Sequence, residues 1–188
     1  MESDTKVFGF WIYLMTDLII FAVLFATLLV LRDATYGGPS GHQLLDVPYA
    51  FVETLILLTS SFTCAVALRK VQNKERNGAV FWFLVTFALG AWFLSRELVE
   101  FSRFVAQGAS WQRSAFLSSF FTLVGTHGLH IAIGLLWLLV TVVRLVLRPL
   151  VDSTIVKIFL PGIFWHFLDF VWIFIFTVVY GMGHLLCI

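Results

Sequence analysis

The sequence has 188 residues, of which 60% are hydrophobic and 12% are charged, with a formal net charge of +1. Soluble domains carry about 25% charged residues, so this composition and its long uncharged runs exclude a soluble globular protein. The near-zero net charge favours no class of partner. The cysteines, Cys64 and Cys187, predict no disulfide framework, and the absence of C-x-x-C and C-x-x-C-H motifs excludes thiol redox chemistry and covalent haem attachment.

Apolar runs in chain order predict five membrane-spanning helices, over residues 8–32, 48–69, 79–104, 115–147 and 155–184. Each run exceeds the roughly 20 residues needed to cross a bilayer. The N-terminal residues lack the basic region of a cleaved signal peptide, so the first run is expected to be a permanent span. We therefore predict an all-α polytopic membrane protein with a single domain over residues 1–188.

The connections between the runs predict the orientation. With five spans, the N-terminus and the second and fourth connections share one side of the membrane. That side carries eight cations, Lys6, Arg69, Lys70, Lys74, Arg76, Arg144, Arg148 and Lys157, whereas the other carries three, Arg32, Arg103 and Arg113. Because cytoplasmic loops are enriched in Lys and Arg, we expect a cytoplasmic N-terminus and a periplasmic C-terminus.

Ionisable residues interrupt every predicted span. A charged side chain at the centre of a bilayer costs at least about 2.5–3.5 kcal/mol, so these groups should face one another, a partner or a water-lined cavity. The candidate polar packing or lipid-cleft residues are Asp17, Glu53, Glu97, His127, His130, His166 and Asp169, with Arg96 and Glu100 beside Glu97.

A rise of about 1.5 Å per residue places these groups at approximate depths. Asp17 and His166 lie at nearly the same depth, and so do His130 and Asp169. We therefore expect two interhelical pairs, Asp17 with His166 and His130 with Asp169.

Three interpretations of these groups remain open. They can fasten helices together as satisfied polar contacts; Gly125, Gly128 and Gly134 would then let helices approach closely. His127 or His130 together with His166 could ligate a haem. The acidic residues and histidines could form a proton path in a transporter, although no inverted repeat is present. No four-ligand set with familiar spacing favours a metal centre.

Five segments, one in each span, together resemble subunit III of the haem–copper oxidases. They are GFWIYLMTD (9–17), FVETLILLTSS (51–61), SRELVEF (95–101), GTHGLHIAIGL (125–135) and FWHFLDFVWIFIFTVVY (164–180). The length resembles the five-span form, and the loop GGPSG (37–41) resembles that of cytochrome bo-type ubiquinol oxidases.

The resemblance implies a subunit without catalytic, cofactor or metal sites of its own, within a proton-pumping terminal oxidase of the bacterial cytoplasmic membrane. Haem b, haem o and copper are expected in subunit I, the main contact, and subunits II and IV are further partners. The chain would stabilise subunit I, bind structural phospholipids and line an oxygen access route, for which Phe62 and Trp92 are candidates. The donor is ubiquinol or, as the alternative, cytochrome c.

Overall fold

The computed structural model describes residues 2–35, 46–147 and 152–181. Its elements are α1 (Glu2–Leu31), α3 (Val47–Gln72), α4 (Arg76–Ala106), α5 (Ala115–Leu147) and α6 (Asp152–Ile175), followed by a π-helical turn, η1 (Phe176–Gly181). All five α-helices are long and apolar enough to cross a membrane. The predicted all-α fold with five spans is therefore confirmed, and the described ranges contain no strand.

Other predictions remain untested. The loop at 37–41, Arg148, Cys187 and the end of the fifth run beyond residue 181 lie outside the described residues. The single domain and the orientation of the termini also stay predictions.

Local side-chain chemistry explains where the helices begin and turn. Asp46 caps α3 by accepting a hydrogen bond from the Tyr49 amide at 3.3 Å, and the Ser114 hydroxyl accepts one from the Leu117 amide at the start of α5. Such caps satisfy amide groups that have no partner within the helix. Lys74 adopts a φ of 59° in the tight α3–α4 turn, a conformation that is uncommon outside glycine.

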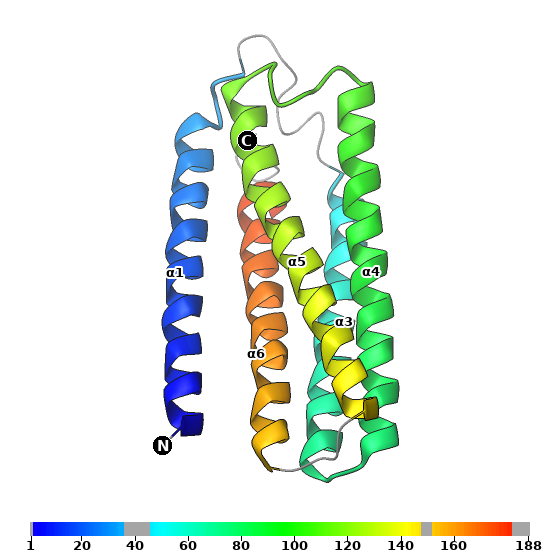
Figure 1. The fold of residues 1–188 in the computed structure, drawn as a ribbon. Helices are drawn as coiled ribbons and strands as arrows, with labels where there is room; N and C mark the ends of the chain where they lie inside the picture. The colour runs from blue at the N-terminus through cyan, green and yellow to red at the C-terminus, as the bar shows by residue number, and fades with distance from the viewer. Residues whose placement is uncertain (1, 36–45, 148–151, 182–188) are drawn as a thin grey trace.

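The helices form an up-and-down bundle in which successive helices run in opposite directions (Figure 1). Helix α6 contacts α1, α3 and α5, and α4 packs between α3 and α5. Helix α1 lies at one edge of the bundle, where its main contacts are with α5 and α6. One end of the bundle holds the start of α1, the α3–α4 turn and the end of α5. We call it the basic end because Arg69, Lys70, Lys74, Arg76 and Arg144 lie there.

One tryptophan joins four helices in the core. Trp165 of α6 is 1% exposed, and its indole N–H donates to the Ser60 hydroxyl of α3 at 2.9 Å. The ring lies against two glycines: a Cβ at Gly90 of α4 would lie 2.5 Å from the indole, and one at Gly134 of α5 would lie 3.2 Å from it. Small residues at these two positions let the indole fill the space between the helices.

Candidate functional site

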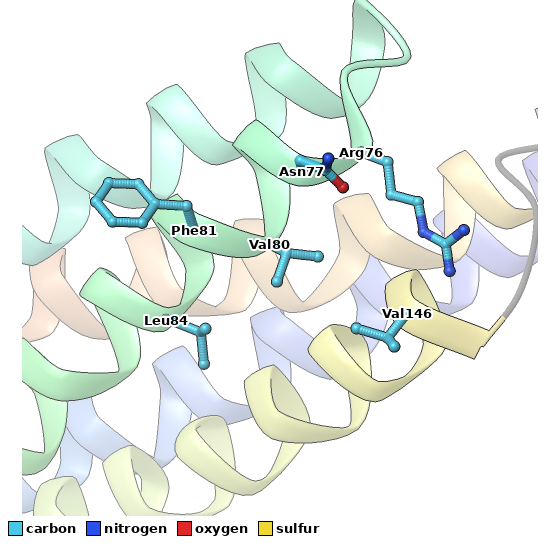
Figure 2. A pocket seen from close by; sticks show the side chains of 6 residues that line it. All are labelled: Arg76, Asn77, Val80, Phe81, Leu84 and Val146. Carbon is cyan, nitrogen blue, oxygen red and sulfur yellow. The ribbon is translucent and has the colours of Figure 1, made fainter.

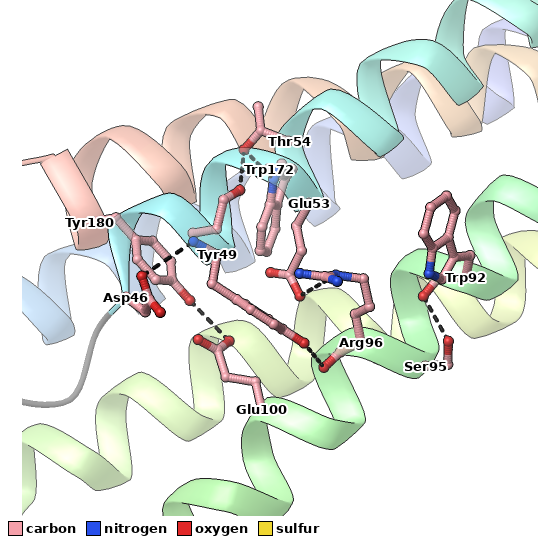
Figure 3. Close-up of polar contacts among 11 residues, drawn as sticks. Asp46, Tyr49, Glu53, Thr54, Trp92, Ser95, Arg96, Glu100, Trp172 and Tyr180 are labelled. Carbon is pink, nitrogen blue, oxygen red and sulfur yellow. Dashed lines mark hydrogen bonds and ion pairs between the residues drawn. The ribbon is translucent and has the colours of Figure 1, made fainter.

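The first polar cluster lies between α3 and α4, towards the end of the bundle opposite the basic end (Figures 1 and 3). The Glu53 side chain is fully buried, and its Oε1 lies 3.8 Å from Arg96 Nε. The Arg96 guanidinium stacks over the Tyr49 ring at 4.0 Å, and the Tyr49 hydroxyl donates to the Arg96 carbonyl at 3.2 Å. A cation–π contact of this kind helps to stabilise a partly desolvated guanidinium.

Two hydrogen bonds connect the region around this cluster to α6 and η1. The Tyr180 hydroxyl of η1 donates to Glu100 Oε2 at 3.2 Å, and the Trp172 indole of α6 donates to the Thr54 hydroxyl at 3.1 Å (Figure 3). Both contacts join residues far apart in the sequence. They hold α6 and η1 against α3 and α4.

Glu97 and His127 occupy the space between α4 and α5. A Cβ at Gly128 would lie 2.8 Å from the Glu97 carboxylate, so the glycine makes room for this buried side chain. Within the described residues, neither carboxylate oxygen of Glu97 nor either ring nitrogen of His127 has a hydrogen-bond partner.

Aromatic rings enclose the His127 imidazole. Trp172 stacks on it with ring centres 5.3 Å apart, and Phe93 packs edge-on at 6.1 Å. A haem ligated by His127 would need a planar gap beside this ring, which the two aromatic side chains occupy. The packing therefore disfavours the haem interpretation at this position.

The second polar cluster connects α1 and α5. Asp17 Oδ2 lies 3.8 Å from His130 Nε2, and Tyr13, one turn earlier on α1, also interacts with Asp17. His130 Nδ1 lies 2.7 Å from the Thr126 carbonyl, which can only accept, so Nδ1 carries the proton and donates. The other ring nitrogen then faces Asp17.

The third polar cluster connects α3 and α6. Ser61 Oγ and His166 Nδ1 lie 2.7 Å apart, and Asp169 interacts electrostatically with both residues. Asp169 is 8% exposed, and its Oδ1 has no hydrogen-bond partner among the described residues.

The pairings predicted from depth are therefore wrong. Asp17 meets His130 rather than His166, and His166 and Asp169 meet Ser61 instead of Asp17 and His130. Depth along a helix does not determine towards which neighbour a side chain points. His130 faces α1, whereas His166 faces α3.

All seven predicted polar residues lie in or beside these three clusters, and none is exposed. The hydroxyl groups of Ser60, Ser61, Thr54 and Tyr180 were not predicted to contribute. In the sequence, these residues can be recognised as hydroxyl side chains within apolar runs, where a helix has few other side chains that can form hydrogen bonds. Among the described residues, no three His, Cys, Asp or Glu side chains gather in a way that could hold a metal ion.

Comparison with known proteins relates nearly the whole chain to one protein family. The family model for cytochrome c oxidase subunit III matches residues 3–184. The chain is 51% identical over 184 residues to cytochrome bo(3) ubiquinol oxidase subunit 3 of Pseudomonas aeruginosa, covering 98% of this chain and 88% of that protein. It is 46% identical to the protein of the same name from Pseudomonas putida, and 45% identical to cytochrome c oxidase subunit 3 of Bacillus sp. (strain PS3), each covering 97% of this chain and 88% of the relative.

Proposed function

The chain belongs to the cytochrome c oxidase subunit III family, and we propose that it is the non-redox structural subunit III of a proton-pumping terminal ubiquinol oxidase, which oxidises ubiquinol and reduces O₂ to water. The observation that carries the proposal is the similarity, over nearly the whole chain, to subunits named as parts of ubiquinol oxidases. The alternative, a subunit of a cytochrome c oxidase, is kept because a relative of that name is almost as similar.

The five apolar helices and the bacterial relatives make the chain a multi-pass bacterial membrane protein. We place it in the cytoplasmic membrane, against subunit I and in a complex with subunits II and IV. Haem b, haem o and copper would then belong to subunit I. The polar clusters support a structural role, because most of their contacts join one helix of this chain to another.

An oxygen access route along this subunit is a further part of the proposal. The side chains of Phe62 and Trp92, the candidates for lining this route, are 68% and 53% exposed. They lie on the outer surface of the bundle, so an oxygen route past them would run along a face covered by lipid or by another subunit.

Copurification tests the proposed function. The affinity-tagged chain is isolated from membranes in mild detergent, and the accompanying subunits, their haems and the oxidation of ubiquinol or reduced cytochrome c are measured. We expect a haem-containing complex that oxidises ubiquinol. Oxidation of cytochrome c alone would favour the alternative, and isolation of the chain without oxidase subunits would contradict both.

The Ser61–His166–Asp169 contacts lead to a prediction about assembly. His166→Leu or Asp169→Asn should lower the yield of assembled oxidase about threefold, and at most about twentyfold, because an interhelical hydrogen bond contributes about 0.6 kcal/mol on average and at most about 1.7 kcal/mol. The turnover of each assembled complex should change little. Phe170→Leu, on the exposed face of the same helix, serves as the control, and a loss of turnover at normal yield would contradict the structural role.

A further inference from the structure

A groove opens at the basic end of the bundle, between the start of α4 and the end of α5 (Figure 2). It has a volume of about 440 Å³ and is lined by Arg76, Asn77, Val80, Phe81, Leu84 and Val146. Its two polar residues are the first two of α4, and three apolar residues, Val80, Phe81 and Leu84, follow over the next two turns. Val146 lines the groove from the end of α5. The groove thus has a polar mouth and an apolar floor.

The Arg76 guanidinium reaches across the mouth of the groove towards α5 (Figure 2). Its Nε donates to the Leu145 carbonyl near the end of α5, which fixes the direction of the side chain. Among the side chains that the structure describes, no carboxylate forms an ion pair with Arg76. Its two terminal amino groups supply further hydrogen-bond donors in a fixed plane.

In the adjacent α3–α4 turn, by contrast, a cation has a carboxylate partner. Lys70 Nζ lies 2.6 Å from Glu75 Oε2, and this hydrogen bond holds the pKa of the Glu75 carboxyl below its ordinary value. The acidic residue next to Arg76 in the sequence is thus already engaged by another cation. The guanidinium at the groove therefore keeps a positive charge that no described side chain neutralises.

The apolar part of the groove follows α4 for a length that can hold part of a hydrocarbon chain. Leu84 lies eight residues after Arg76, which corresponds to about 12 Å along the helix. Phe81 and Leu84 are 59% and 46% exposed, respectively. A cation at one end of an apolar groove of this length complements a molecule with an anionic head and a hydrocarbon tail.

We propose that this groove binds one anionic phospholipid, with its phosphate on Arg76 and Asn77 and one acyl chain along Val80, Phe81 and Leu84. Charge complementarity favours this occupant, because an apolar partner helix would leave the guanidinium unpaired at the groove mouth. Basic residues near a membrane surface attract anionic lipids by about 1 kcal/mol each. This site rests on the proposed function, because it gives a location to the phospholipid binding implied there. It requires that the chain lies in a membrane, and it is the same whether the electron donor is ubiquinol or cytochrome c.

The test measures lipid retention by the intact complex that contains this chain. The complex is equilibrated in mild detergent with phosphatidylglycerol or with phosphatidylcholine of the same acyl chains, and bound lipids are counted by native mass spectrometry. Arg76→Gln should weaken retention of phosphatidylglycerol about fivefold, the equivalent of about 1 kcal/mol. Arg69→Gln removes an exposed cation at the same end but outside the groove and should have a smaller effect.

A second variant keeps the test decisive if loss of the Leu145 contact impairs folding. Leu84→Trp leaves Arg76 intact and fills the apolar floor, so it should displace one lipid. Equal retention of the two lipids by the wild-type complex, equal effects of the two arginine variants, or unchanged retention in Leu84→Trp would each overturn the inference. Subunit composition and ubiquinol oxidation are measured on the same samples, so failure of this inference is distinguishable from failure of the proposed function.

Discussion

Replacing Arg96 with methionine is expected to lower the yield of assembled complex strongly. Its partner Glu53 is fully buried, and removing one member of a buried ion pair costs up to about 3–5 kcal/mol when the other group stays charged. Glu53 Oε1 and Arg96 Nε lie 3.8 Å apart without a hydrogen bond, so we expect a cost at the lower end of that range. That cost is a large fraction of the roughly 5–15 kcal/mol by which folded domains are typically stable. The yield of assembled complex and its thermal midpoint, both measured in detergent, check the prediction.

A double-mutant cycle separates this effect from a loss of packing. Glu53→Gln should be milder than Arg96→Met, because the guanidinium is 24% exposed and keeps its contact with the Tyr49 ring. Combining the two substitutions should recover much of the yield, since no buried charge then remains without a partner. A double variant no better than Arg96→Met would show that Arg96 matters for its shape rather than for its charge.

Adding a single methyl group at Gly90 is the second large perturbation. The new Cβ would lie 2.5 Å from the Trp165 indole, and the ring cannot retreat towards Gly134, where even a Cβ would be only 3.2 Å away. The indole also donates to Ser60, so moving it breaks a buried hydrogen bond. We expect Gly90→Ala to cost about 1–3 kcal/mol, the usual range for overpacking, and to lower the thermal midpoint and yield.

Gly125→Ala is the matched control, because its Cβ would meet Phe101 at 3.7 Å, an ordinary contact. It should be neutral or stabilising, since alanine favours a helix over glycine by up to about 1 kcal/mol. Trp165→Phe should also partly restore Gly90→Ala by removing the clashing ring. If Gly90→Ala behaved like Gly125→Ala, the close packing of α4 and α6 would be refuted.

The number and type of the helices could be predicted from the sequence because a long apolar run has one solution in a bilayer. A membrane offers no water to unpaired backbone groups, so each run must satisfy its own hydrogen bonds as a helix. The motifs indicated the family in the same direct way, since each span contributed a short segment in the correct order.

The contacts between helices could not be predicted in the same way. Asp17 and His166 have matching depths, yet Asp17 meets His130, because depth along an axis leaves the rotation of each helix and its neighbours undetermined. Gly134 is recognisable in the sequence as a small residue, but its role depends on Gly90 and Trp165, which lie on two other helices. Such a contact depends on three helices at once, and no periodicity within one run encodes it.

The indole of Trp165 has a consequence for the order in which the chain is made. Its three neighbours, Ser60, Gly90 and Gly134, belong to helices that precede α6 in the sequence. Until α6 has been synthesised and inserted, the surfaces of α3, α4 and α5 that receive the indole cannot reach their final packing. The last helix to be made therefore supplies the side chain that fills the space between the three helices before it, so the core of the bundle is completed only at the end of synthesis.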